Sequence, residues 1–433
     1  MRKRRIIWST TAVLSIGAMF ALSACGASGG GGDSEGTIHW LTERGQNDPT
    51  IMAVRQIAEA YAEEHPEFKL EIETVPDRPT MDQKLRTLAA SKELPEMFDA
   101  DPEPFFKSIV DSGQVADIGA LYEELGVSDA FFPISVSYPQ WPDGSLNLMT
   151  LQANVEYFWW NTKLFEEAGV EPPATLSELE GVCSDLKAAG ITPIAINGKD
   201  QWPFYRYLAM PAFRETGNEF IDALKTGKDS MSGETGERSI EFLESMSGCF
   251  QDGFSNTDLT TAVNLFATGE AAMMYIGSWQ LPNFLGEDGE LKPEFSTFQI
   301  PASSGADVTS PDTDYFAVSG IGTAIRKDAL TPELKEFLSY FFANYGDVAF
   351  NDFHIIPSVR PDVDTAELPQ IYQQIFDDLE KNDVSAKVWD VQLDPATNTV
   401  LGRESTNLLI GQSSAEDFAK RVDESVESYL GKQ

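Results

Sequence analysis

Histidine and basic residues are scarce in this 433-residue chain, and each shortage argues against a class of function. The three histidines, His39, His65 and His354, lack the spacing of metal ligands, which argues against metal catalysis. The 31 Lys and Arg residues are outnumbered by 69 Asp and Glu residues, and a formal net charge of −38 disfavours binding to nucleic acid or to anionic lipid headgroups. A Gly-x-x-x-x-Gly-Lys stretch, which would bind nucleotide phosphates, is absent.

The N-terminus has the pattern of a secretory leader. Four basic residues follow Met1, and an uncharged, mainly apolar run extends from Ile6 to Leu22. The next residues lead into Cys25, and the stretch Leu-Ser-Ala-Cys resembles a lipobox, where the Cys is lipidated and becomes the first residue. An uncleaved membrane anchor is the alternative, although a spanning helix needs about 20 apolar residues. We expect a signal peptide over 1–24, lipidation of Cys25 and a flexible Gly/Ser tether over 25–36, so that the protein is extracytoplasmic and anchored to the cell membrane.

The remaining chain of about 400 residues contains two further cysteines and is long enough for two domains. Cys183 and Cys249 each fall on the apolar stripe of a helical pattern. An even pair in an oxidising compartment is a disulfide candidate, and two separate buried thiols are the alternative.

Apolar residues along the exported chain alternate between the periods of strands and helices. Phe68, Leu70 and Ile72 alternate with charged residues as in a half-buried strand, whereas the apolar residues from Met81 to Ala89 recur at helical spacing. The pattern predicts an α/β fold around mostly parallel sheets. Strands are expected over 37–41, 96–100, 192–196, 271–276 and 316–325, and helices over 175–190, 257–268, 332–344 and 415–430.

Three segments resemble the extracellular solute-binding proteins of carbohydrate ABC importers, whose best-known fold is that of maltose-binding protein. They are YFWWNTKLFEEAG at 157–169, KAAGITPIAI at 187–196 and FATGEAAMMYIGSW at 266–279. The resemblance implies two α/β lobes of the periplasmic-binding-protein type, with a ligand cleft between them. Lobe 1 would comprise 37–152 and 316–362, and lobe 2 would comprise 153–313 and 366–433, with hinge crossings near 152–156, 314–318 and 362–367.

Candidate ligand contacts on the lobe 2 side are aromatic. Sugar rings stack their C–H faces on aromatic side chains, and open α/β sheets bind ligands beyond the carboxyl ends of their strands. Trp279 follows the strand at 271–276 and matches the family's stacking Trp, whereas Trp202 and Tyr205 follow the strand at 192–196. Trp389 resembles a late aromatic contact of the family. For each of these residues, packing in the core or under a loop is the alternative.

Polar candidates follow the strands of lobe 1. Glu43 comes after the first strand, and Asp99 and Asp101 end or follow the third, with a solvated loop as the alternative. Of the adjacent Trp159 and Trp160, at most one can face the ligand if both lie in a strand, and we single out Trp160. Arg360 could donate to a sugar hydroxyl, with helix capping as the alternative.

The resemblance implies a binding protein without cofactor or metal rather than an enzyme. It would be a monomer that captures a sugar and delivers it to the membrane permease, without binding nucleic acid. A secreted glycoside hydrolase, which needs two carboxylates about 5–9 Å apart, is the main rival. A polyamine, peptide or metal chelate is an alternative cargo, because acids and rings also attract cations. The serine motif Gly-x-Ser-x-Gly occurs at 26–30 and at 32–36, both within the tether, where no strand is expected before it.

Overall fold

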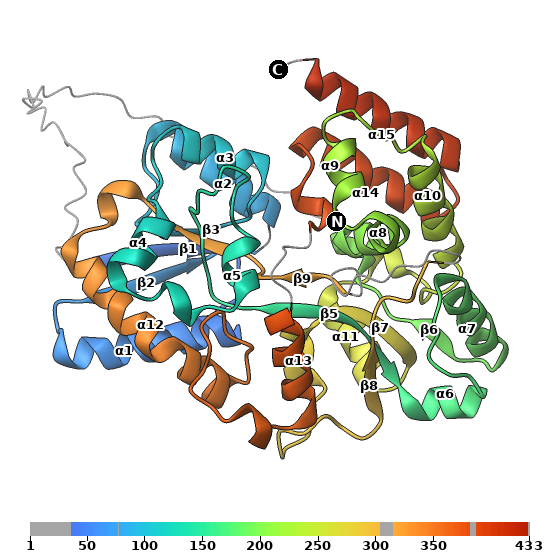
Figure 1. Ribbon diagram of the computed structural model, residues 1–433, viewed down its shortest axis with the longest axis horizontal. Helices are drawn as coiled ribbons and strands as arrows, with labels where there is room; N and C mark the ends of the chain where they lie inside the picture. Colours follow the sequence, from blue (N-terminus) through green and yellow to red (C-terminus); the bar gives the residue numbers. More distant parts are fainter. Residues whose placement is uncertain (1–35, 77, 304–314, 382–386, 432–433) are drawn as a thin grey trace, which may run out of the picture. The chain divides into compact units, whose positions relative to one another are not determined.

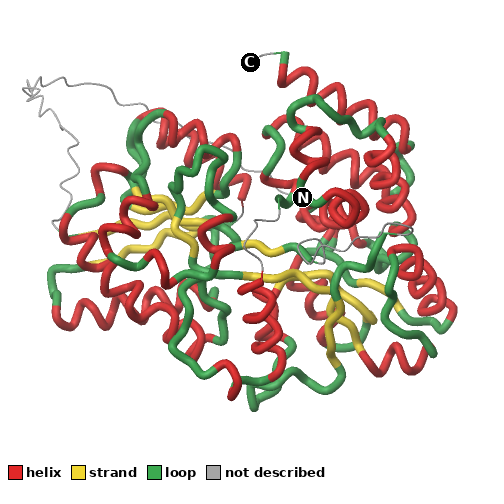
Figure 2. The backbone as a smooth tube through the Cα atoms, in the orientation of Figure 1, coloured by secondary structure: helices red, strands yellow, loops and turns green. Residues whose placement is uncertain are grey.

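The computed structural model describes residues 36–76, 78–303, 315–381 and 387–431. The expected signal peptide, Cys25 and all but the last residue of the expected tether lie outside these ranges. Within them, no helix combines the length and apolar character that a membrane crossing requires. The α/β fold class is confirmed, because the strands form two separate sheets with helices packed on both (Figures 1 and 2).

The first sheet is built from five strands in the order β2-β1-β3-β10-β4. Strands β2, β1 and β3 pair in parallel, and β10 pairs antiparallel with both β3 and β4. The strands are β1 (Thr37–Thr42), β2 (Lys69–Thr74), β3 (Met97–Ala100), β4 (Met149–Thr150) and β10 (Gly322–Ile325).

Helices α1 and α12 pack together beside this sheet (Figure 1). Helix α1 begins with Asp48 as its cap and Pro49 at its first position, as the sequence indicates. Helix α12 runs well past Asn344, where the sequence pattern ends it. The helices of this region are α1 (Pro49–Glu64), α2 (Arg78–Ser91), α3 (Pro104–Asp111), α4 (Ile118–Leu125), α5 (Pro133–Ser137) and α12 (Pro332–Phe353).

The second sheet has the order β6-β7-β5-β8, and β9 pairs with the start of β5. Only β6 and β7 are parallel, so the expectation of mostly parallel pairing is wrong for this sheet. The reason is that β5 arrives from the first sheet and runs opposite to β7. The strands are β5 (Asn154–Asn161), β6 (Thr192–Ile194), β7 (Ala271–Gly277), β8 (Phe295–Phe298) and β9 (Ala317–Val318).

The helices that follow β5 in sequence, apart from α12, surround this second sheet. Helices α8, α10, α14 and α15 pack on one another, and α13 packs against β5. They are α6 (Thr162–Ala168), α7 (Leu176–Ala188), α8 (Trp202–Thr216), α9 (Glu219–Leu224), α10 (Glu234–Met246), α11 (Leu259–Ala267), α13 (Gln370–Lys381), α14 (Pro395–Leu409) and α15 (Ala415–Leu430).

The single strand expected over 316–325 is in fact two strands that belong to different sheets. β9 pairs with β5 beside the second sheet, and β10 lies in the first. Gly320 between them has φ of +66°, a left-handed conformation that favours glycine and bends the chain. The chain therefore returns from one sheet to the other at this point, antiparallel to its outward passage between β4 and β5.

Candidate functional site

Asp99 is the centre of a buried polar cluster where β1 and β3 end. Its carboxylate accepts hydrogen bonds from Trp40 Nε1 at 2.9 Å, Thr42 Oγ1 at 2.5 Å and Thr323 Oγ1 at 2.7 Å, and it pairs with Arg44. Burial raises the pKa of Asp99, and the Arg44 guanidinium opposes that rise. Asp99 has no exposed surface, and its hydrogen bonds to Trp40, Thr42 and Thr323 connect the ends of β1, β3 and β10.

Arg78 lies above this cluster and is more accessible. Its Nε and Nη2 donate to Glu43 Oε1 at 3.3 and 3.1 Å, and its Nη1 pairs with Asp101 Oδ2. The Arg78 side chain is 39% exposed, and together with Asp82 these groups line a small surface hollow. We call Glu43, Arg78, Asp82 and Asp101 the charged edge. It offers donors and acceptors side by side at the carboxyl ends of β1 and β3.

A further carboxyl, Glu103, lies near the charged edge, at the start of α3. Burial raises its pKa to about 7, and the neighbouring Asp82 adds to the rise, while Arg78 opposes it. Burial also raises the pKa of Asp82. A carboxyl group that keeps its proton near neutral pH can donate a hydrogen bond as well as accept one.

Trp279 is placed by the glycine at the end of β7. The chain turns at Gly277 into a short 3₁₀ helix, η4 (Ser278–Asn283). A Cβ atom on Gly277 would lie 1.8 Å from Cζ3 and 2.2 Å from Cε3 of Trp279, so the indole occupies the space that any other residue's side chain would need. The ring is half-buried and retains solvent contact beyond the strand.

Trp202, at the start of α8, brings a second half-buried ring to the same place. The Trp202 and Trp279 ring centroids are 6.2 Å apart, with the planes at 60°. The Cζ atom of Arg206, one turn further along α8, lies 5.0 Å from the centre of the Trp202 ring. Two of the predicted residues are therefore brought together, although they are far apart in the sequence.

Arg206 connects these rings to two carboxylates. Its Nε donates to both oxygens of Glu156 in β5, at 3.0 and 2.9 Å, and its Nη1 donates to Asp390 Oδ1 at 2.5 Å. Burial raises the pKa of the fully buried Glu156, and Arg206 opposes that rise. We call Trp202, Arg206, Trp279 and Asp390 the aromatic edge. Sequence reasoning missed Arg206, Asp390 and Glu156, as it missed Arg78 on the charged edge.

Tyr205 and Trp389 lie next to members of the aromatic edge in sequence, but both side chains are buried. Tyr205 is 5% exposed and donates through its hydroxyl to the carbonyl of Asn398 at 3.3 Å, in α14. Trp389, in the short helix η8 (Trp389–Val391), is 3% exposed and packs on Phe220 with ring centroids 5.6 Å apart. In this conformation both side chains pack in the core, which was the alternative to ligand contact.

Trp160 and Arg360 lie elsewhere. Trp160 is at the far end of β5 from the crossing and packs on Phe165, with ring centroids 4.7 Å apart. Arg360 bonds the two carboxylate oxygens of Glu380 at 2.6 and 3.0 Å and donates to the carbonyl of Asp129 at 3.1 Å. These contacts make Arg360 a brace between α13 and the loop before α5.

A chain of polar side chains runs along the crossing from α1 to the turn that bears Trp279. Gln152 Nε2 donates to Thr50 Oγ1 at 2.9 Å, and Asn154 Nδ2 is 3.4 Å from Gln152 Oε1. Ser278 Oγ then donates to Asn154 Oδ1 at 3.0 Å. The residue beside Trp279 is thereby connected to the N-terminal turn of a helix on the first sheet.

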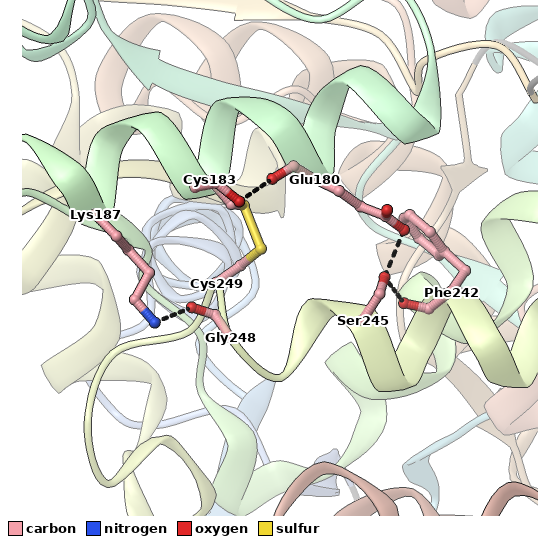
Figure 3. The surroundings of a disulfide bond; sticks show 8 residues. Glu180, Cys183, Lys187, Phe242, Ser245, Gly248 and Cys249 are labelled. Atoms are coloured by element: carbon pink, nitrogen blue, oxygen red, sulfur yellow. Dashed lines mark hydrogen bonds between the residues drawn. A yellow bond between two sulfur atoms is a disulfide. The ribbon is translucent and has the colours of Figure 1, made fainter.

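Cys183 and Cys249 form a disulfide with Cα atoms 5.3 Å apart (Figure 3). It joins α7 to the segment after α10, and two hydrogen bonds flank it: Lys187 Nζ to the carbonyl of Gly248 at 2.8 Å and Ser245 Oγ to Glu180 Oε1 at 2.6 Å. Both cysteines are buried, away from the two edges. The bond therefore stabilises the helices around the second sheet.

Residues 49–345, more than half of the chain, match the family described as bacterial extracellular solute-binding protein. The chain belongs to this family. Its members considered below are binding proteins by their printed names, in agreement with the resemblance found in the sequence. Within the residues that the structure describes, no group of three or more potential metal ligands occurs.

Curated relatives match parts of the chain at low identity. A "Multiple sugar-binding protein" of Streptococcus mutans is 23% identical over 65% of this chain and 66% of its own length. A "Probable sugar-binding periplasmic protein" of Brucella suis is 24% identical over 38% of this chain and 39% of its own length. The match thus spans from about two fifths to just under two thirds of these relatives.

Solved structures of binding proteins share the fold over nearly their whole length. A "Chitin oligosaccharide binding protein" superimposes with a TM-score of 0.79 at 21% identity, covering 91% of this chain and 98% of that one. The GacH receptor of Streptomyces glaucescens, solved unliganded and in complex with acarbose, gives a TM-score of 0.71 at 17% identity, covering 92% and 98%. The two-sheet architecture is therefore shared with these two binding proteins.

Proposed function

We propose that this protein is the substrate-binding component of an ABC importer, and that it captures a sugar or oligosaccharide outside the membrane and delivers it to the permease. One observation carries the choice of ligand: the half-buried Trp202 and Trp279 rings lie together, and the Arg206 guanidinium over Trp202 is paired with the Asp390 carboxylate. A pyranose needs both, because its C–H faces stack on rings while its hydroxyls bond to polar groups around its edge.

The proposed ligand site lies between two lobes, with boundaries as predicted from the sequence. The charged edge and the aromatic edge would be its two halves, and closure of the lobes would remove water from both. A ligand that prefers the closed state shifts the protein toward it, so that the permease meets mainly loaded protein. The proposed contacts are Trp279, Trp202, Glu43, Asp101 and Arg78.

We further propose that the exported protein is a monomer held to the cell membrane by lipidated Cys25. The lipobox resemblance supports the anchor, and the Gly/Ser-rich segment 25–36 supports a flexible tether. Metabolic labelling with a palmitate analogue tests this proposal. Incorporation that Cys25→Ser abolishes supports it, whereas equal incorporation into the Cys25→Ser variant contradicts it.

A ligand panel tests the sugar assignment. Purified protein is titrated with chitin oligosaccharides, xylo-oligosaccharides, raffinose, galactose and acarbose while tryptophan fluorescence and the melting temperature are followed. We expect one sugar to quench or shift the fluorescence and to raise the melting temperature, because a ligand that binds only the folded state stabilises it. A response confined to spermidine or to a peptide mixture contradicts the sugar assignment.

The same titration separates a binding protein from a glycoside hydrolase. The relatives and the structures of similar fold are binding proteins, which supports an absence of catalysis. After prolonged incubation the bound sugar is recovered and analysed by mass spectrometry. We expect the intact sugar, and shortened products would favour the hydrolase.

A further inference from the structure

Asp390 is presented to solvent next to Trp389, a residue that is itself turned into the core. It belongs to the short helix η8, whose fold buries the Trp389 ring against Phe220 and leaves the Asp390 side chain 18% exposed. Asp390 Oδ1 accepts from Arg206, whereas no described residue donates a hydrogen bond to Oδ2. Oδ1 is thus held by Arg206, and Oδ2 can accept a hydrogen bond from another group.

Arg206 fixes the direction of that carboxylate. Arg206 is 5% exposed, and its Nε is held by the two oxygens of Glu156, which has no exposed surface. A planar guanidinium with two carboxylate partners has little rotational freedom. The same group lies against the Trp202 ring, so a single buried side chain sets both the ring and the carboxylate.

Asp390 is close to both edges of the candidate site. Burial is the largest cause of the raised pKa of Glu103, and the charge of Asp390 adds to it. The charge of Asp390 also acts on Arg78. Burial lowers the pKa of Arg78, but nearby carboxylates, Glu43 and Asp390 among them, together raise it above its usual value. Asp390 therefore lies near groups of the first sheet as well as beside the rings of the second.

We propose that Asp390 is a specificity-determining ligand contact whose free oxygen accepts a hydrogen bond from a sugar hydroxyl, and that Arg206 is the positioning residue that holds it beside Trp202. This inference rests on the proposed function. It assigns to the C-terminal segment a carboxylate contact in place of the ring predicted from Trp389. A hydroxyl bonded to a carboxylate is held more strongly than one bonded to a neutral group, so Asp390 selects sugars with a free hydroxyl at that position.

The first test replaces Asp390 with Asn and uses the sugar from the panel that binds the wild type. The substitution keeps the shape but loses the charge, and we expect affinity to fall at least about tenfold, as for a hydrogen bond to a charged group. Asp377→Asn is the matched control, since Asp377 is exposed on α13, and its affinity should equal that of the wild type. Unchanged affinity of a folded Asp390→Asn variant overturns the inference.

A double-mutant cycle tests whether Arg206 acts through Asp390. Arg206→Lys keeps the charge but not the fork of donors, and we expect it to weaken sugar binding in the wild type by several-fold more than in the Asp390→Asn background. Equal losses in both backgrounds overturn the positioning role. If Arg206→Lys does not fold, the effect of Arg206→Gln is compared in a Glu156→Gln background and in a Glu156→Gln, Asp390→Asn background, which avoids leaving Glu156 as an unpaired buried charge.

The outcomes separate this inference from the proposed function. A wild-type protein that binds none of the panel sugars contradicts the proposed function, and this inference with it. If the wild type binds a sugar and the Asp390→Asn variant binds it with the same affinity, this inference alone is overturned.

Discussion

The two edges of the candidate site differ in the side chains that they present. The charged edge of the first sheet carries Arg78 between the carboxylates of Glu43 and Asp101. The aromatic edge of the second sheet carries two indoles, with its charges on one side of them. Under the proposed function, the charged edge would bind the hydroxyls of a sugar and the aromatic edge would bind its apolar faces.

The edges also differ in what supports them. A buried ion pair, Arg44 with Asp99, lies beneath the charged edge, and Arg44 also donates to the carbonyl of Ile321 at 2.5 Å. The aromatic edge is supported by backbone at Gly277 and by the ion pair of Arg206 with Glu156. Substitutions beneath the first edge should therefore affect stability, and substitutions on the second should affect affinity.

The largest expected effect comes from removing the support beneath the charged edge. Asp99→Ala leaves the Arg44 guanidinium without its buried partner, and we expect a loss of about 3–5 kcal/mol in the free energy of unfolding. Denaturation in urea measures it. The control is Asp111→Ala, whose side chain is 61% exposed and pairs only with Lys107, so its loss should stay below about 1 kcal/mol. Similar losses for both variants would contradict the assignment of Asp99 as a structural centre.

The next largest effect concerns the aromatic edge. Trp279→Ala removes a stacking surface, and we expect sugar affinity to fall by about 2 kcal/mol, or about 30-fold, while the protein remains folded. Isothermal calorimetry with the sugar identified from the panel measures the change. Trp160→Ala is the comparison, because Trp160 packs on Phe165 at the far end of β5 and should lower stability without altering affinity. Wild-type affinity in Trp279→Ala would remove this residue from the site.

The smallest effect is a pH dependence near the charged edge. Burial raises the pKa of Glu103 from 4.5 to about 7, so the folded state holds this proton more tightly than the unfolded state does. The corresponding stability is fully present below about pH 4.5 and is lost as the pH rises through about 7. The melting temperature of the wild type should therefore fall, relative to that of Glu103→Gln, between these values. Parallel curves for the two proteins would show that Glu103 titrates normally.

The sequence was sufficient for the fold class, and it named two rings that the structure brings together. Alternating periods and the capping residues of α1 and α7 are local signals, and they predicted elements that the structure contains. The strand expected at 316–325 was wrong because its two halves pair with different sheets, which no local pattern reveals. Trp202 and Trp279 were found because each follows a strand, and all ligand contacts named from the sequence stay predictions.

The missed residues share a physical cause. Arg206 acquires its role from Glu156 and Asp390, which lie 50 and 184 positions away in the sequence. Arg78 likewise meets Glu43 from 35 positions away. In a chain with 69 acidic residues, an arginine has many possible partners, and composition cannot select among them. One local feature could have pointed to Arg206. It lies within a largely apolar helix at a buried position, where an arginine needs a carboxylate partner because an unpaired buried cation is costly.

Gly277 has a consequence for how this protein can change its ligand. The six-membered part of the Trp279 indole fills the volume that a methyl group at position 277 would need, so even alanine there would push the ring out of its place. Gly277 is the last residue of the central strand β7, and its backbone cannot move aside as a flexible side chain would. If the proposed stacking on Trp279 holds, the position of that surface is constrained by the backbone, and new ligand preferences would arise from the residues around it, such as Trp202 and Asp390.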